Sequence, residues 1–254
     1  MIKATLNHTL RRSPSHFILD SYVRLNYSDL SPVSMKTPVI HNTRIAILDA
    51  AERLFAARGF KSTSLRAITA LAGANLGAVN YHFASKDSLI LAVLIRRLKP
   101  LNERGTALLD QFERESGRKP VKLEKIIEAM FRPALELIAK PSQGGRNFLR
   151  LLAYTLSESG KFLKPLLEEQ FAEKNRRFHK CLMKTLPGLS ASETYWKMHF
   201  SYGVFVHTIS HPHILEISSH NLCKLEDTEN TLEQTVAFCA AGFRNSKLTS
   251  KQKS

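Results

Sequence analysis

Three neighbouring side chains in this sequence could recognise a nucleic acid. Asn80, Tyr81 and His82 follow one another, and each carries a hydrogen-bond donor that can reach a phosphate or a base edge. Gly77 and Ala78 precede them, and residues this small would let a backbone come close to a groove. The residue types and their spacing therefore predict hydrogen bonding to DNA.

Two short helices joined by a tight turn would position these side chains. The first is expected over residues 64–72, and its apolar residues recur at helical spacing: Leu65, Ile68, Leu71 and Ala72. Gly73 can take the positive φ that turns the chain, and Asn75 is expected to cap a second helix over residues 76–83. A helix-turn-helix of this kind places its second helix in a DNA major groove.

Residues next to the two helices could add contacts to phosphates. Lys86 stands at the start of the next expected helix, where a cation and free N–H groups can hold a phosphate. Thr63 is expected to cap the first helix and to offer its hydroxyl to a phosphate. The complete set of expected DNA-binding residues is Thr63, Ser64, Arg66, Asn75, Gly77, Ala78, Asn80, Tyr81, His82 and Lys86.

The surrounding segment resembles the DNA-binding domain of the TetR family of transcriptional repressors. The matching pieces are ILDAAERLFAARGF at 47–60, TSLRAI at 63–68, LAGANLGAVNYHF at 71–83 and SKDSLI at 85–90. The family usually has an aromatic residue at the position of Asn80, and the order Asn-Tyr-His-Phe found here looks like the PsrA-like, fatty-acid-responsive branch. A structural helical hairpin in another all-helical protein is the alternative.

The resemblance implies an all-α fold in two parts. An N-terminal three-helix helix-turn-helix domain for DNA binding is expected over residues 35–92, and a helical effector-binding and dimerisation domain over 93–246. Residues 1–34 show no sustained period and are expected to be disordered or, if translation starts at Met35, absent; a basic arm that grips DNA is the alternative. Residues 247–254 are expected to form a frayed basic tail.

The charge of the chain favours a polyanionic partner. The 254 residues are 43% hydrophobic and carry a net charge of +15, from 37 basic and 22 acidic side chains. Between Lys36 and Lys99, ten basic and three acidic residues give a net charge of +7, and the helix-turn-helix lies within this stretch. Such a basic excess is typical of nucleic-acid binding, although a generally basic proteome would produce the same composition.

Other classes of partner are disfavoured. The three cysteines, Cys181, Cys223 and Cys239, lack CxxC spacing and are expected to be reduced, buried thiols rather than a disulfide framework or a zinc site. No apolar run reaches the roughly 18 residues that span a bilayer, and the N-terminal residues do not read as a signal peptide. We therefore expect no cofactor and no membrane partner, and a cytoplasmic location.

A histidine cluster supports a competing metal hypothesis. His207 and His211 are one helical turn apart and His213 lies close by, so that these side chains could share a metal. No carboxylate or cysteine stands at a matching ligand offset, and Pro212 interrupts the helix. A histidine-rich helix end is therefore the expected structure.

The rest of the sequence predicts helices separated by polar breaks. The expected helices cover residues 43–58, 86–109, 121–139, 147–159, 165–186, 190–210 and 228–243. Pro100 is expected to kink the second of these helices, and loops are expected at 114–120 and 211–226. Ser190 and Glu193 have the spacing of a capping box.

The second domain resembles the PsrA-like branch more loosely. The similar pieces are FRPALEL at 131–137, LLAYTLSES at 151–159 and YWKMHFSYGVFVHTI at 195–209. In the family the last two long helices form a four-helix dimer interface, which here implies a homodimer joined through residues 190–210 and 228–243.

Members of the family also hold a small apolar effector in this domain. Its expected lining is Met130, Phe131, Leu135, Phe148, Leu152, Phe171, Phe178, Met198, Tyr202 and Phe205. Apolar residues at helical spacing also describe plain core, which is the alternative at each position.

Together these features predict a DNA-binding transcriptional regulator. Its expected form is a homodimeric repressor that a small apolar effector, such as a fatty acid or an acyl thioester, releases from a palindromic operator. The effector would move the helix that starts at residue 86, on which Arg96, Arg97 and Lys99 are expected to form a solvated face.

Two alternatives remain. One is an effector-independent DNA-binding nucleoid or division protein on the same scaffold. The other is an all-helical enzyme, which is disfavoured because the chain has no GxSxG, phosphate-loop or HExxH motif.

Overall fold

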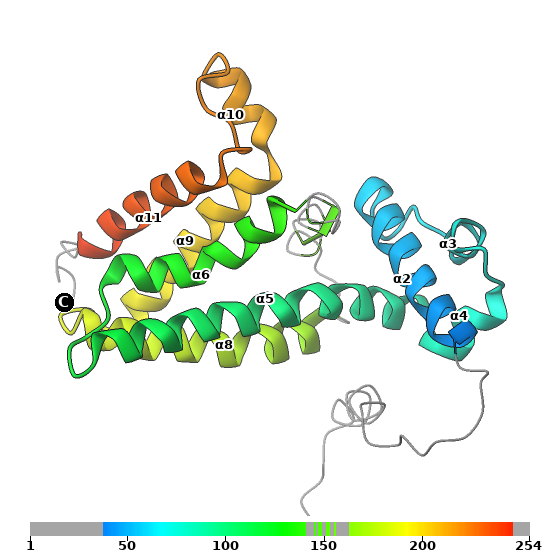
Figure 1. The fold of residues 1–254 in the computed structure, drawn as a ribbon, viewed down its shortest axis with the longest axis horizontal. Helices are drawn as coiled ribbons and strands as arrows, with labels where there is room; N and C mark the ends of the chain where they lie inside the picture. The colour runs from blue at the N-terminus through cyan, green and yellow to red at the C-terminus, as the bar shows by residue number, and fades with distance from the viewer. Residues whose placement is uncertain are drawn as a thin grey trace, which may run out of the picture. The chain divides into compact units, whose positions relative to one another are not determined.

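Helices account for all regular structure in the part of the chain that can be described. The computed structural model describes residues 38–140, 145, 147, 148, 151, 152, 155 and 163–245. Every regular element among them is a helix, and no strand occurs in these residues (Figure 1). The predicted all-α fold is therefore confirmed. The expected extension over residues 1–34 and the expected tail over 247–254 lie outside the described residues.

Three helices make up the first part of the described chain. α2 spans Pro38–Arg58, α3 spans Leu65–Ala72 and α4 spans Leu76–Phe83. The bounds of α3 and α4 agree with the prediction, whereas α2 begins before its expected start at Thr43. Proline is tolerated in the first turn of a helix because the N–H groups there have no helical partner, so Pro38 can begin α2.

α5 is a single helix of 31 residues, Lys86–Ser116, and is longer than predicted. Its polar C-terminal sequence concealed a helical period that Leu109 and Phe112 continue on the buried side. The helix ends at Gly117, whose φ of 60° lies in the left-handed region that glycine adopts readily. The loop predicted at 114–120 therefore begins later than expected.

Among the fully described segments, four long helices and one short helix follow α5. They are α6 (Leu123–Ile138), α8 (Leu163–Thr185), α9 (Ala191–Ser210), α10 (Pro212–Ser218) and α11 (Thr228–Arg244). The four long helices match predicted helices to within about two residues at each end. In the predicted helix over 147–159 the described residues are all helical: Asn147, Phe148, Leu151, Leu152 and Thr155.

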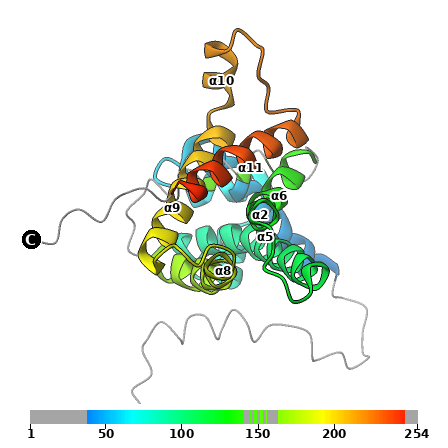
Figure 2. The same cartoon turned by 90° about the vertical axis from the view of Figure 1, so that its left-hand side faces the viewer.

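α10 corrects the prediction of an unbroken loop over residues 211–226. Pro212 occupies the first turn of α10, so the proline that ends α9 also starts the next helix. None of the residues of α10 is buried, and the helix projects beyond α9 and α11 (Figure 2). Ile214 and Ile217 expose their apolar side chains there.

The helices after α4 pack around a shared apolar core. α5 contacts α6 and α8, α6 also contacts α11, and α9 contacts both α8 and α11 (Figure 1). Four fully buried aromatic side chains come from separate parts of this bundle: Phe131, Phe148, Phe178 and Phe243. Burial of each phenylalanine contributes roughly 1.5–3 kcal/mol, so these rings are a main source of the stability of the bundle.

Local hydrogen bonds fix the start of α9. The Ser190 hydroxyl accepts the N–H of Glu193 at 3.2 Å, and the Glu193 carboxylate accepts the N–H of Ser190 at 2.9 Å. The predicted capping box is therefore confirmed. The hydrogen bonds from the hydroxyl and the backbone of Ser190 hold the pKa of Glu193 below its ordinary value.

Candidate nucleic-acid interface and internal cavity

The turn between α3 and α4 is held by caps at both helix starts. The Ser64 hydroxyl accepts the N–H of Ala67 at 3.1 Å, and Asn75 Oδ1 accepts the N–H of Ala78 at 2.8 Å. Gly73 ends α3 with a φ of 61°, as its place in the sequence predicted. The two helices therefore form a defined helix-turn-helix unit, which we call the reading head together with α2.

The polar residues of α4 are open to contact. Tyr81 is 78% exposed, and Asn80 and Gly77 are also exposed. His82 and Lys86 are half-buried. Val79 and Phe83 are buried on the opposite side of the helix, so α4 is anchored by one face and presents the other. This is the arrangement that a helix needs to enter a DNA groove.

Thr63 is a correction to the expected DNA-binding set. Its side chain is 1% exposed, and its hydroxyl donates to the carbonyl oxygens of Gly59 at 2.8 Å and Leu54 at 3.3 Å. Ser64, and not Thr63, caps α3. Thr63 therefore ties the end of α2 to the start of α3 and cannot reach a phosphate.

Leu71 is a second correction, because it was expected on the buried face of α3. It is 47% exposed, whereas Ile68 is fully buried. α3 has only eight residues, and among them Ile68 and Thr69 are the buried ones. Leu71 therefore lies outside the buried side of this short helix.

The charge of His82 depends on its surroundings. Partial burial lowers the pKa of His82, and the nearby positive charge of Arg44 lowers it further. The Arg44 guanidinium lies over the Phe83 ring, with Cζ 5.4 Å from the ring centroid. In the free protein the neutral imidazole is therefore favoured.

A cavity of about 660 Å³ lies between α5, α6, α8 and α9. Six of the ten residues expected to line such a space do line it: Met130, Phe131, Leu152, Phe171, Tyr202 and Phe205. Phe131 stacks on Phe205 with ring centroids 4.5 Å apart and meets the edge of Tyr202 at 5.7 Å. The wall of the cavity is therefore largely aromatic and apolar.

The other four expected residues do not line the cavity. Leu135, Phe148, Phe178 and Met198 are all buried but belong to the packed core. Leu135, for example, faces α11, where it lines a shallow depression with Thr228 and Leu232. For these four positions the alternative reading, plain core, is the correct one.

Polar side chains gather at one part of the cavity wall. The Tyr202 hydroxyl donates to Asn175 Oδ1 at 3.2 Å, and burial raises the pKa of Tyr202 above its ordinary range. Asn102 Nδ2 donates to the backbone oxygen of Gln170 at 2.7 Å. Lys174 lines the same space, and burial lowers its pKa to about 8.

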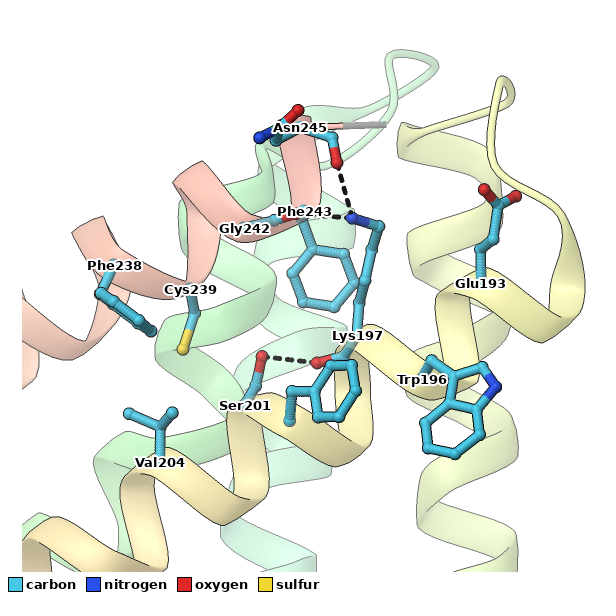
Figure 3. Close-up of a pocket in the computed structure, with 11 residues that line it drawn as sticks. Glu193, Trp196, Lys197, Ser201, Val204, Phe238, Cys239, Gly242, Phe243 and Asn245 are labelled. Atoms are coloured by element: carbon cyan, nitrogen blue, oxygen red, sulfur yellow. Dashed lines mark hydrogen bonds between the residues drawn. The ribbon is translucent and has the colours of Figure 1, made fainter. Parts of the chain in front are cut away.

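An apolar groove of about 490 Å³ lies between α9 and α11 (Figure 3). Its exposed large side chains are Trp196, Phe200, Val204 and Phe238. Lys197 crosses the groove and donates from Nζ to the carbonyl oxygens of Gly242 at 2.6 Å and Asn245 at 3.0 Å (Figure 3). This lysine therefore satisfies carbonyl groups at the C-terminal end of α11.

The histidines and cysteines of the described residues lie in different surroundings. Within the described part of the chain no three His, Cys, Asp or Glu side chains are grouped as metal ligands, and no helix is both long and apolar enough to cross a bilayer. His207 and His211 stack with ring centroids 5.1 Å apart and line the cavity. Cys223 is exposed, which corrects the expectation that all three thiols are buried.

Sequence comparisons agree with this geometry. The family described as "Bacterial regulatory proteins, tetR family" matches residues 47–93, and "Tetracyclin repressor-like, C-terminal domain" matches residues 128–242. TtgW of Pseudomonas putida, an uncharacterised HTH-type transcriptional regulator, is 32% identical over 137 residues, which cover 54% of this chain and 88% of TtgW. The chain belongs to the TetR family of transcriptional regulators. It is therefore a DNA-binding regulator.

Other similar proteins add less to the TetR assignment. TtgR of Pseudomonas putida, an HTH-type transcriptional regulator, is 46% identical over 52 residues, which cover 20% of this chain and only 25% of TtgR. The fatty acid degradation regulator FadR of Bacillus halodurans has a TM-score of 0.55 at 14% identity, over 83% of this chain and 99% of FadR. A SmeT–triclosan complex has a TM-score of 0.52 at 21% identity, over 77% and 90%. These two structures share the TetR fold.

This TetR-family chain holds its reading head through ion pairs that the sequence reading missed. Glu52 on α2 is 3% exposed and accepts hydrogen bonds from Arg96 and Arg97 on α5, with Arg97 Nε 3.1 Å from Oε2. Arg96 also donates to Asp49 at 2.6 Å. Arg96 and Arg97 therefore do not form a merely solvated face. The sequence feature that could have revealed this pairing is Glu52 itself, a glutamate on the apolar side of α2 between Leu48 and Phe55.

Lys174 and Asn175 were also missed. They stand between Phe171 and Phe178, which the sequence reading placed on an apolar stripe of α8. A lysine within such a stripe was the signal that a polar group enters the interior of this regulator.

Proposed function

We propose that this TetR-family regulator is a homodimeric repressor that a small apolar effector releases from a palindromic operator. The supporting observation is that α5 both lines the cavity and bonds to the reading head. Leu98, Leu101 and Asn102 line the cavity, and Arg96 and Arg97, less than two turns earlier, bond to α2. A ligand that prefers a shifted α5 would move α2 with it and alter the position of the reading head.

In this proposal α4 enters the major groove while the ends of α3 and α5 meet phosphates. Thr63 is excluded because it is buried. The proposed DNA-binding residues are Ser64, Arg66, Asn75, Gly77, Ala78, Asn80, Tyr81, His82 and Lys86. The reading head corresponds to a domain over residues 35–92 and the remainder to an effector and dimerisation domain over 93–246, with the boundary inside α5.

A second copy would cover the groove between α9 and α11. The exposed side chains of Trp196, Phe200, Val204 and Phe238 form an apolar surface of the kind that interfaces bury. One reading head contacts only a few base pairs, whereas two heads related by a dyad read two half-sites. Homodimerisation therefore supplies the affinity that a short operator requires.

The cavity sets the size and character of the proposed effector. A volume of about 660 Å³ lies within the range of roughly 300–1,000 Å³ that is usual for drug-sized ligands. FadR is named for fatty acid degradation and SmeT was solved with triclosan, which supports a small apolar effector here. A fatty acid or an acyl thioester, as in the PsrA-like branch, fits the proposal, and such a DNA regulator would act in the cytoplasm.

The proposal is tested by titrating the operator complex with a series of acyl compounds and measuring DNA release. Tyr202→Phe keeps the ring that lines the cavity and removes its hydroxyl. It should preserve DNA binding and shift the effector concentration at half-release by about fivefold, the effect of roughly 1 kcal/mol for one hydrogen bond. Tyr195→Phe, on the exposed side of α9, is the control and should leave the titration unchanged.

The same titration separates the proposal from its alternatives. An effector-independent nucleoid or division protein would bind DNA, and none of the acyl compounds would release it. In that case the cavity would be only a packing feature, and the repressor proposal would be wrong.

A further inference from the structure

Lys174 occupies a confined position among four helices. It projects from α8 toward α5, where its Cε lies 3.9 Å from the place that a Cβ on Gly105 would take. Gly105 itself stands against α6, because a Cβ there would lie 3.0 Å from the carbonyl oxygen of Ala129. Lys174 Nζ is 5.8 Å from the ring centroids of both Phe178 and Tyr202. The ammonium group therefore sits against aromatic faces at the cavity wall.

Two carboxylates of the neighbouring helices are engaged elsewhere. Glu136 on α6 pairs with Arg104 at 2.9 Å, and Asp110 on α5 pairs with Arg177 at 2.7 Å. Among the described residues, no ion pair includes Lys174. Lys174 is half-buried, and an ammonium that is partly desolvated without a counter-charge is unfavourable, so an anion entering the cavity would be stabilised.

The other residues around the cavity match an anion and not a cation. Its described lining contains one lysine and three histidines, His199, His207 and His211, but no aspartate or glutamate. Asn175 lies next to Lys174 and accepts from Tyr202 through Oδ1, which keeps its N–H donors for a second partner. The remaining wall is mostly apolar, from Leu98 and Leu101 on α5 to Ile209 on α9.

We propose that the effector of this site is an amphiphilic organic anion whose charged head pairs with Lys174 while its apolar body fills the cavity. The inference rests on the proposed function and specifies the chemical class of the effector. The lysine selects against cations and, through its enclosed charge, favours an anionic head over a neutral polar one. Asn175 supplies the second donor to the head group.

Direct binding without DNA tests this proposal. Calorimetry would compare decanoate and decyl sulfate with decanol and decyltrimethylammonium, which share one chain length. The wild-type protein should bind the two anions about tenfold or more tightly than decanol, and the cation least. Comparing decanoate with decyl sulfate shows whether the site prefers a carboxylate.

Two variants assign the preference to the lysine. Lys174→Met keeps a linear side chain and should remove the preference for anions over decanol. Because it removes an enclosed charge, it should also fold and melt at a temperature no lower than the wild type. Lys180→Met, an exposed lysine on the same helix, is the matched control and should retain the preference. Equal wild-type affinity for decanoate and decanol, or a preference that survives Lys174→Met, would overturn the proposal.

The outcomes for this site and for the repressor function can be told apart. Anion binding without operator release would support the Lys174 site and defeat the effector-controlled repressor. Operator release by decanol as readily as by decanoate would support the repressor and defeat the anion site. No binding of any of the four compounds would defeat the anion site.

Discussion

His82 lies on the proposed DNA-contacting face of α4 with a pKa that favours its neutral form. Partial burial and the nearby Arg44 both lower that pKa, burial having the larger effect. A DNA phosphate close to the ring would oppose both effects, because an anion stabilises the imidazolium. Binding of DNA should therefore raise the pKa of His82 and draw a proton from solution.

Operator affinity should consequently increase as the pH falls from about 7.5 to 6, the range in which histidine ordinarily titrates. The sign follows from a pKa that is higher in the complex than in the free protein, so that protonation favours binding. His82→Gln should remove the increase, whereas Tyr81→Phe should keep it. Fluorescence anisotropy on a labelled operator at several pH values measures the effect. An affinity of the wild type that does not change with pH would contradict the phosphate contact.

Single residues were predictable from the sequence where their partners are close in the chain. Asn75 and Ser190 cap helices through atoms three residues away, so the local pattern was sufficient. Leu71 and Met198 were assigned wrongly because their surroundings depend on helices distant in sequence. Thr63 is an exception, because its hydroxyl bonds to Gly59 and Leu54, which are close in the chain, and its burial was still missed. Helical period identifies an apolar face, but it does not tell whether that face meets a core or a cavity.

At the scale of elements, the groove between α9 and α11 leaves large apolar side chains exposed to water. Phe200 is 60% exposed and Phe238 is 65% exposed, and both line the groove. Exposed aromatic side chains in one groove are unfavourable in water, and a second copy of the same two helices would bury them.

Phe200→Glu should therefore produce monomers, because two carboxylates would have to be desolvated at the dyad. The monomers should have at least about tenfold lower operator affinity, since each carries one reading head. Tyr195→Glu is the control, because Tyr195 is an exposed aromatic residue on the same helix outside the groove and stacks on His179 at 4.0 Å. Analytical ultracentrifugation measures the mass, and a dimeric Phe200→Glu protein would show that the interface lies elsewhere.

The elements themselves were predictable to different extents. The ends of α3, α4 and α9 were predicted to within about one residue because turn and capping residues mark them. α10 was missed because Pro212 was read as a breaker, although a proline at the first turn also starts a helix. The end of α5 was missed because charged residues on its exposed side concealed the period of its buried side.

The whole molecule combines excess positive charge with acidic side chains of which several are paired with arginine or lysine. The net charge is +15, and hydrogen bonds from Arg177 and Arg104 hold the pKa values of Glu113 and Glu136 below their ordinary value. These carboxylates therefore stay ionised and paired at neutral pH, and the stability they add is lost as the pH falls through their lowered pKa values. The unpaired excess of basic side chains remains for the phosphate backbone.

In the proposed mechanism an effector acts on the reading head through α5, and Glu52 is the buried residue that joins α5 to α2. This carboxylate accepts from two arginines of α5 and is 3% exposed, whereas Asp49 bonds only Arg96 and its side chain is 62% exposed. A displacement of α5 by a ligand would reach α2 through these contacts. Any resulting coupling is reciprocal, because the effector weakens DNA binding by the same factor by which DNA weakens effector binding.

Glu52→Gln should lower the coupling factor between effector binding and DNA binding toward one. The affinity for effector in the absence of DNA should stay near the wild-type value. Glutamine has no charge, and its NH2 group offers only donors where the second carboxylate oxygen accepted, so it holds the two guanidinium groups less well and α2 would no longer follow α5. The variant should also lose about 2 kcal/mol of stability in urea unfolding, since the arginines are partly exposed and the full penalty of a broken buried pair does not apply. Asp49→Asn should change the coupling factor and the stability in urea unfolding little. The measurement is operator affinity with and without decanoate, together with decanoate affinity with and without operator. A wild-type coupling factor in Glu52→Gln would show that the signal reaches the reading head by another route.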